Sequence, residues 1–267
     1  MFSVTGQDVL PRIGAPRMTA QLVALTFDAH DARRLGRFWA AFLGRDAVEE
    51  PGGGVTLLSN GWGRRGDPGD GAGFHLRFVP SAEPKRGPNQ MHFDLTSRSP
   101  QEQRDLVARA LELGGRHLDI GQGQVEHVVL ADPDGNEFDV IEPGNNFLSE
   151  CGLIGALAGD GSQATGYFWS RALDWPLVWD QDQETAIRSP QGGPKITWGG
   201  PPLQAKAGKE RLHFDLAPPP GEDQQAEVER LIGLGATRVD VGQRDVDWVV
   251  LADPDGHEFC LLTPRSA

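Results

Sequence analysis

A long internal repeat restricts the fold of this chain more than any other feature of the sequence. Three motifs recur 121 positions later: MHFDLT (91–96) as LHFDLA (212–217), LELGGR (111–116) as IGLGAT (232–237), and LADPDGNEF (130–138) as LADPDGHEF (251–259). A constant separation over three motifs indicates a duplicated unit with no insertion between them. The chain is therefore expected to contain two copies of one domain.

The front halves of the two copies also correspond, at a different separation. FWAAFLGRDAV (38–48) matches FWSRALDWPLV (168–178), 130 positions later. The first copy therefore has about nine extra residues before its shared motifs, and the glycine-rich stretch GWGRRGDPGDGAG (61–73) is the expected place for them, as a long loop.

Domain boundaries follow from the repeat. We expect one domain at 20–143 and a second at 153–264, joined by a linker at 144–152 in which Pro, Gly and Asn cluster. Residues 1–19 are expected to form a flexible extension, because they precede the first strand-like segment.

Composition limits the partners. The net charge of −13 repels phosphate backbones and anionic lipid heads, so we expect neither nucleic acid nor a membrane as partner, and a small molecule remains. No apolar run is long enough to cross a bilayer, and the N-terminus does not resemble a secretory signal. The two cysteines, Cys151 and Cys260, cannot make a disulfide framework, which favours a reducing cytoplasm.

Each copy shows the same order of elements. A buried strand at 20–29 precedes a helix at 30–44, and short strands follow around 54–59 and 74–79. MHFDLT then forms a strand, and the next helix has Ser99 as its cap, Pro100 in its first turn and Glu102 in a capping box. Strands at 125–131 and 136–142 complete the copy. The pattern predicts an α+β fold with two βαβββ modules in each copy.

The repeated acidic turn has a simple structural explanation. Asp132-Pro133-Asp134-Gly135 suits a tight hairpin turn, and its aspartates are expected to be solvated. The functional interest lies four residues past the glycine, where the next strand carries Asp139 in copy one and Cys260 in copy two.

The HFDL strand, the LGG/LGA helix end and the LADPDGNEF hairpin resemble the vicinal oxygen chelate superfamily, in particular its glyoxalase-like, bleomycin-resistance-type bacterial members. The resemblance implies paired βαβββ modules whose sheets curl into a cup, and some members hold a divalent ion there. It places His92 and Asp139 at ligand positions of copy one, and His213 and Cys260 at those of copy two. Members of this family exchange modules, so the cups can form within or between copies, and a homodimer is also compatible.

The first module of each copy departs from the metal-binding pattern. Alignment from the FW helix places its ligand positions near Ala24 and Leu57 in copy one, and near Ile154 and Ala186 in copy two. None of these side chains can bind a metal, and a stable site needs about three protein ligands. Any bound ion, such as zinc, iron, nickel or manganese, would rest on His92 and Asp139.

Strand alternation places His92 and Asp94 on one face, and Glu137 and Asp139 on one face of the closing strand. His92 and Asp139 could then form a general base and its orienting carboxylate without a metal, or His92 could be a structural histidine. Trp198 and Trp248 are candidate ligand contacts in the second cup.

Three functions remain open at this point. The first is a protein that binds a small organic molecule in a cup without a complete metal site, as in resistance by sequestration. The second is a divalent-metal-dependent lyase, isomerase or dioxygenase that uses His92 and Asp139. The third is an interaction module with vestigial cups. The missing ligands of the first modules favour the first function.

Overall fold

The computed structural model describes residues 19–67, 69–121, 123, 125–206 and 208–264. The extension predicted at the N-terminus lies outside the described residues, apart from Thr19. The fold is α+β, as predicted, and the order strand, helix, three strands occurs four times.

The four modules have the following elements. Module 1 contains β1 (Gln21–Ala29), α1 (Ala32–Leu43), β2 (Ala47–Glu49), β3 (Val55–Leu57) and β4 (His75–Pro80). Module 2 contains β5 (Met91–Leu95), α2 (Pro100–Glu112), β6 (Arg116–His117), β7 (Val128–Ala131) and β8 (Glu137–Val140). Module 3 contains β9 (Ile154–Gly159), α3 (Gln163–Leu173), β10 (Leu177–Gln181), β11 (Glu184–Arg188) and β12 (Lys195–Trp198). Module 4 contains β13 (Leu212–Ala217), α4 (Gln224–Leu234), β14 (Thr237–Arg238), β15 (Val249–Ala252) and β16 (Glu258–Leu261).

The predicted start of α2 is confirmed, except that Glu102 accepts a hydrogen bond from the backbone N–H of Arg98 and not from that of Ser99, as a capping box would require. Ser99 Oγ accepts a hydrogen bond from the backbone N–H of Glu102 at 3.1 Å, and Pro100 occupies the first turn, where its missing N–H has no cost. In α1, Gly44 ends the helix in the left-handed conformation at φ 70°, which glycine adopts without strain.

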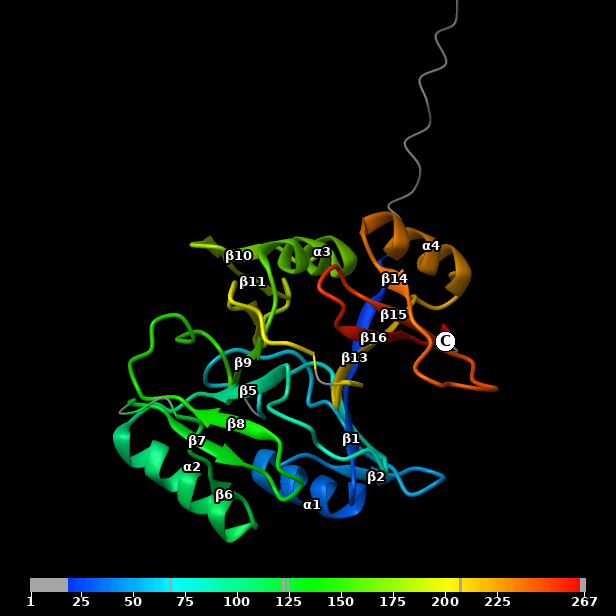
Figure 1. Ribbon diagram of the computed structural model, residues 1–267. Coiled ribbons are helices and arrows are strands. Elements are labelled where there is room, and N and C mark those ends of the chain that lie inside the picture. Colours follow the sequence, from blue (N-terminus) through cyan, green and yellow to red (C-terminus); the bar gives the residue numbers. More distant parts are fainter. Residues whose placement is uncertain (1–18, 68, 122, 124, 207, 265–267) are drawn as a thin grey trace, which may run out of the picture.

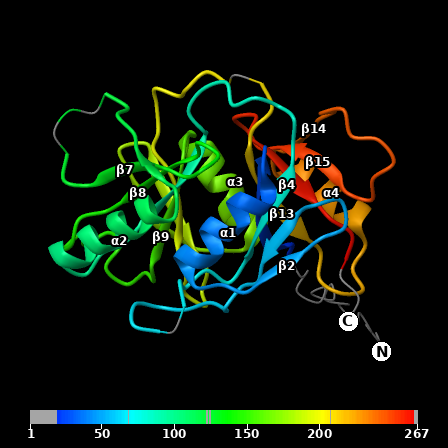
Figure 2. The same cartoon turned by 90° about the horizontal axis from the view of Figure 1, so that it is seen from below.

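The modules pair across the two copies. Sheet A has the strand order β14-β15-β16-β13-β1-β4-β3-β2 and so joins modules 1 and 4, whereas sheet B has the order β10-β11-β12-β9-β5-β8-β7-β6 and joins modules 2 and 3. In both sheets the first strands of two modules meet antiparallel at the centre. The sequence left pairing within or between copies open, and the structure shows pairing between them (Figures 1 and 2).

The hydrophobic core lies between the two sheets, around α1 and α3. Trp39 of α1 packs edge-on against Phe93 and Phe138 of sheet B, with ring centroids 5.2 and 5.1 Å apart. Trp169 of α3 makes the same contacts with Phe214 and Phe259 of sheet A. The opposite face of each sheet points away from this core, and we call these faces cup A, which bears His213, and cup B, which bears His92.

The acidic turn fixes these helices to the hairpins. The two oxygens of Asp132 accept hydrogen bonds from Trp39 Nε1 at 3.1 Å, from Asn136 Nδ2, and from the backbone N–H groups of Asp134 and Asn136. Asp253 accepts from Trp169 Nε1 at 3.0 Å in the same way. The prediction of solvated aspartates is therefore wrong for these two residues, which are buried because each one satisfies an indole N–H in the core.

The glycine-rich loop at 61–73 connects the copies. Asp70 forms a wholly buried ion pair with Arg45, and Gly193 donates a 2.8 Å backbone hydrogen bond to Gly63. A Cβ at Gly73 would lie 2.1 Å from the ring of Trp62, so the indole fits only because this residue is glycine. The end of this loop, from Asp70 to Gly73, is thus packed against the rest of the protein, whereas residues 64–67 are exposed.

The sequence predicts that the chain has no membrane-spanning segment and no disulfide framework. Cys151 and Cys260 are both free and buried. In the described ranges, none of the helices has the length and apolar character needed to span a bilayer.

Candidate functional site

Cup B brings together a histidine and two carboxylates. His92 Nε2 lies 3.4 Å from an Asp94 oxygen and 3.6 Å from an Asp139 oxygen. The side chains of His92 and Asp139 thus share one face of the sheet, as strand alternation predicts.

The local sequence explains this placement. β5 and β8 are parallel neighbours, with Phe93 paired to Phe138 and Asp94 paired to Asp139. Because both phenylalanines enter the core, the residues on either side of them must face the cup. The aromatic positions therefore determine where the polar cluster lies.

Two further residues belong to this cluster, and the sequence reasoning did not count them as ligands. Asp94 shares the face of His92, so alternation alone could have identified it. His127 lies one residue before β7, with its Nε2 at 4.0 Å from an Asp139 oxygen. His127 falls in the strand expected at 125–131 and shares a face with Val129, which pairs with Asp139, so alternation could also have identified it.

The ionisable side chains in cup B shift the pKa values of one another. Burial is the largest influence on the pKa of His92 and lowers it, but Asp94, Asp139 and Glu137 together outweigh burial and raise the pKa above its ordinary value. Burial raises the pKa of Asp139, as do the neighbouring charges of Asp94 and Glu137. The neighbouring carboxylates therefore favour the protonated form of His92 and make its imidazole a stronger base than a free one.

The cluster in cup B fits a divalent metal ion. One ligand atom each from His92, Asp94 and Asp139 lie within 4.8 Å of one another. Imidazole nitrogen and carboxylate oxygen are the donors that iron, manganese, nickel and zinc accept. Three protein ligands also leave coordination positions for a bound molecule, as in catalytic metal sites.

Cup A contains a matching cluster that fits a metal poorly. His213, Asp215 and Cys260 also lie close together, but Thr26 Oγ1 already donates a 2.7 Å hydrogen bond to Asp215. Arg77 places a guanidinium nitrogen 3.7 Å from the same carboxylate, and this permanent positive charge would repel a cation. Burial raises the pKa of Cys260, and the charge of Asp215 adds to this, so the thiol keeps its proton.

The predicted ligand positions of the first modules need correction. Leu57 and Ala186 lie on β3 and β11, and both are wholly buried. The last strands of these modules are β4 and β12, where Arg77 and Lys195 face the cups. The positions predicted on the last strands are wrong because counting from the FW helix ends on β3 and β11, one strand before the last, although neither observed residue is a metal ligand.

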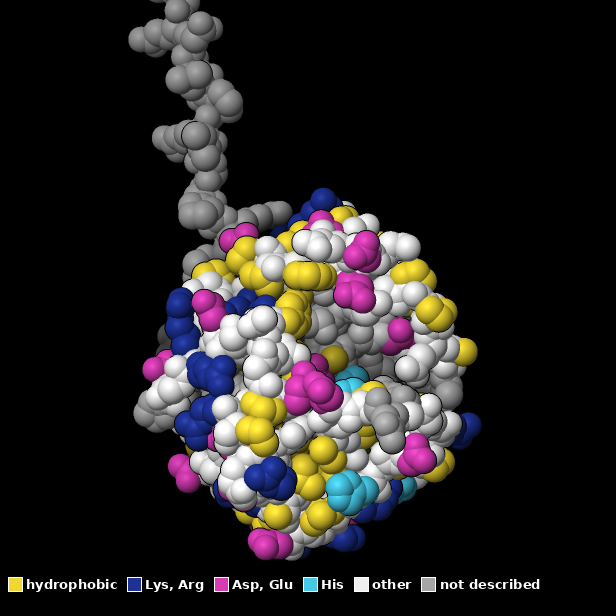
Figure 3. All heavy atoms as spheres, turned by 90° about the vertical axis from the view of Figure 1, so that its left-hand side faces the viewer, with side chains coloured by type: hydrophobic (Ala, Val, Ile, Leu, Met, Phe, Trp, Pro, Cys, Tyr) yellow, Lys and Arg dark blue, Asp and Glu magenta, His cyan; other side chains and the backbone are white. Residues whose placement is uncertain are grey.

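Each cup contains a cavity of a size suited to a small molecule. The cavity of cup A has a volume of about 310 Å³ and is lined by Arg77, His213, Cys260 and the half-exposed Trp248 among others. In cup B a cavity of about 620 Å³ lies at the β10–β12 side of sheet B and is lined by Phe147, Trp179 and Lys195 among others; none of the described residues that line it belongs to the cluster of His92, Asp94 and Asp139. Figure 3 shows the side of the molecule where β7 to β11 lie, with a hollow that has a histidine side chain at its floor.

The predicted tryptophan contacts have different outcomes. Trp248 borders the cup A cavity, where a ligand could reach its ring. Trp198 lies in sheet B and borders the cup B cavity with only 2% of its surface exposed, so its role as a ligand contact stays a prediction. Trp179, which the sequence reasoning did not select, is 37% exposed and lines the cup B cavity.

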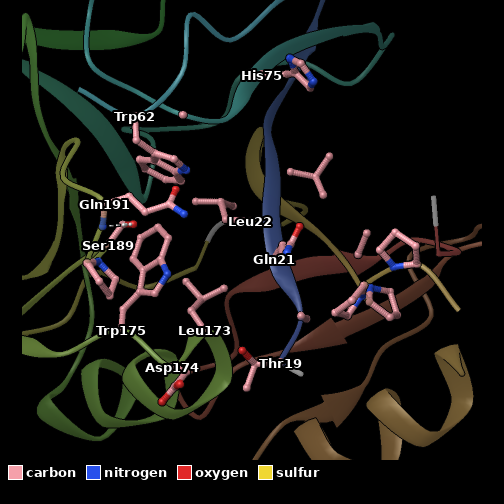
Figure 4. Close-up of a pocket in the computed structure, with 18 residues that line it drawn as sticks. Thr19, Gln21, Leu22, Trp62, His75, Leu173, Asp174, Trp175, Ser189 and Gln191 are labelled. Carbon is pink, nitrogen blue, oxygen red and sulfur yellow. Dashed lines mark hydrogen bonds between the residues drawn. The ribbon is translucent and has the colours of Figure 1, made fainter. Parts of the chain in front are cut away.

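A third cavity of about 630 Å³ lies outside both cups, where β1 approaches the end of α3. Figure 4 shows Trp62 and Trp175 on one wall, in edge-on contact at 5.3 Å, with Gln21 and Leu22 of β1 across from them. One indole comes from each copy, so this wall belongs to the contact between copies rather than to either polar cluster.

Comparisons with known proteins agree with this architecture. The chain is 27% identical over 157 residues to a Caenorhabditis briggsae protein named Glyoxalase 1, a match that covers 55% of this chain and 52% of that protein. The chain therefore spans about half the length of this curated relative. Glyoxalase I from Zea mays superposes with a TM-score of 0.59 at 12% identity, over 92% of each chain.

A Bacillus subtilis protein provisionally named a dioxygenase superposes with a TM-score of 0.56 at 16% identity, over 94% of this chain and 87% of that one. At such low identity these structures show a shared fold and no more. The family described as "Glyoxalase-like domain" matches residues 24–141 and 157–262, which is most of the sequence. The chain therefore belongs to the glyoxalase-like family of the vicinal oxygen chelate superfamily, with two copies of the domain.

Proposed function

We propose that this protein binds a small organic molecule in cup B with the help of one divalent metal ion, while cup A binds its ligand without a metal. The observation that carries the proposal is the cluster of His92, Asp94 and Asp139. Asp94 supplies the third ligand that was missing from the expectation of an incomplete metal site.

The difference between the cups supports this division. In cup B the carboxylates of Asp94 and Asp139 face only histidines as possible cations within 4.0 Å, among the residues that the structure describes. In cup A the guanidinium of Arg77 occupies the neighbourhood of Asp215. A cation gains electrostatic energy from the first arrangement and loses it in the second.

A bound ion would act as a Lewis acid toward ligand oxygens. His92, Asp94 and Asp139 would hold it, and His127 lies beside Asp139, where it can keep that carboxylate in place. The aromatic wall of the cavity would exclude water from one side of the ligand. This arrangement supports the class of metal-dependent lyases, isomerases and dioxygenases for cup B.

Metal-free binding in cup A is a second candidate function, favoured by Arg77. Its guanidinium forms two hydrogen bonds to Glu50, of 3.0 and 2.7 Å, and so is held in a fixed position at the cavity. A fixed cation beside the exposed ring of Trp248 is typical of a binding pocket for a polar organic molecule.

Metal titration of matched variants tests the proposal. Chelator-treated wild-type protein, Asp94→Ala and Asp215→Ala are titrated with Mn²⁺ and with Zn²⁺ in a calorimeter. Loss of one ligand is expected to weaken binding by about tenfold or more in Asp94→Ala, with no effect in Asp215→Ala. Equal affinity in all three proteins, or no binding to wild type, would refute the metal site.

A further inference from the structure

Lys195 lies in cup B as a half-buried cation, in the same row of the sheet as the polar cluster. The strand registers pair Asp139 with Asp94, Asp94 with Ala156, and Ala156 with Lys195. Each strand adds about 4.8 Å, so the backbone positions of Asp94 and Lys195 are about 10 Å apart.

The pairing of Lys195 is unlike that of the other lysines. The chain has four lysines, and Lys85, Lys206 and Lys209 each form an ion pair with a carboxylate. Within the described ranges, the ion pairs at 4.0 Å or less include none with Lys195. Glu184, the other charged residue at this cavity, is exposed and lies beyond that distance.

The contacts that Lys195 does make leave hydrogen-bonding capacity unused. Its Nζ donates one 2.5 Å hydrogen bond to the backbone carbonyl of Phe147 and lies 3.7 Å from the centre of the Phe147 ring. An ammonium group has three N–H donors. Burial lowers the pKa of Lys195, because the half-buried ammonium group has lost part of its hydration.

The rest of the cavity wall is apolar and aromatic. Trp179 packs edge-on against Phe147 with ring centroids 5.7 Å apart, and Val178 extends the same wall. Between Lys195 and Asp94 in this row lies Ala156, which is wholly buried against Ile141 and Leu148. The room for a flat apolar body is therefore beside the ammonium group, against Trp179, Phe147 and Val178.

We propose that the ligand of cup B is an organic acid with an apolar, preferably aromatic, body, whose anionic group binds Lys195 while the body lies against Trp179 and Phe147. This inference deepens the proposed function, and it rests on that function only for the statement that cup B binds a small organic molecule. The anion contact itself requires no metal.

The test compares matched ligands. A panel of one- and two-ring aryl carboxylates, each beside its neutral primary amide, is titrated by calorimetry into wild-type protein, Lys195→Met, Lys195→Arg and Arg104→Met. Arg104→Met is the control, because it removes one positive charge from the exposed surface of α2. All titrations are run on chelator-treated and on metal-loaded protein.

We expect wild-type protein, Lys195→Arg and Arg104→Met to bind at least one carboxylate about ten- to a hundredfold more tightly than its amide, as charge-assisted hydrogen bonds usually give. Lys195→Met should lose that preference in both metal states. The inference is overturned if no carboxylate of the panel binds wild type, or if carboxylate and amide bind it equally. A preference that persists in folded Lys195→Met also overturns it. If chelator-treated wild-type protein prefers the carboxylate over its amide but takes up no metal when metal is added, the anion site is supported and the metal site is refuted. The two failures can therefore be distinguished.

Discussion

Replacing Trp39 by Phe tests whether the acidic hairpin is a structural joint. The change removes the hydrogen bond from Trp39 Nε1 to Asp132 and leaves a small cavity beside Phe93 and Phe138. A hydrogen bond to an ionised buried acceptor contributes about 1.5–3 kcal/mol. The lost apolar contacts add about 1–2 kcal/mol, because Trp39 is wholly buried. We therefore expect the free energy of unfolding to fall by about 2.5–5 kcal/mol.

Urea unfolding followed by far-ultraviolet circular dichroism measures this change without depending on tryptophan fluorescence. Trp169→Phe should lose a similar amount, because its indole makes the equivalent bond to Asp253. Trp248→Phe is the matched control, with an expected change below about 0.5 kcal/mol, since its ring is half exposed. A loss in Trp39→Phe no larger than in this control would refute the assignment of the hairpin as a joint.

Two further predictions concern the same core and the contact between copies. Burial raises the pKa of Asp132 to about 6, so the folded protein binds the proton of this carboxyl group more tightly than the unfolded chain does. The contribution of Asp132 to the free energy of unfolding is therefore complete below about pH 4 and is lost as the pH rises through about 6. Urea midpoints from pH 4 to 7 should show this decline in wild type, and a flat profile in this range would contradict it. Gly73→Ala should cost about 1–3 kcal/mol, because the new methyl group would overlap Trp62; thermal unfolding checks this against Gly233→Ala, where the same methyl group meets open space.

The repeat and the strand alternation predicted much of what the structure shows. The constant separation of the motifs identified the duplicated units, and the alternation around Phe93 and Phe138 placed His92 and Asp139 on one face. These features succeed because they depend on local periodicity, and each strand must bury its aromatic side chains.

Other features depend on contacts that the local sequence does not encode. Strand edges pair through backbone groups, so the side chains of β1 and β5 do not indicate that each strand pairs with a strand of the other copy. The local sequence predicts a solvated turn residue at Asp132, because Trp39, whose indole N–H binds it, lies 93 residues earlier in the chain. Lys195 could not be assigned to the cup from the sequence, because the different spacing in the first modules obscured which strand is last.

The metal content of protein purified without chelators tests the central claim most directly, with His92→Ala and His213→Ala measured beside wild type. The two histidines occupy equivalent positions 121 residues apart, so each variant serves as the control for the other. The account predicts one ion per chain in wild type and in His213→Ala, and a strong loss in His92→Ala. Two ions per chain, retention in His92→Ala, or loss only in His213→Ala would contradict a single metal site in cup B.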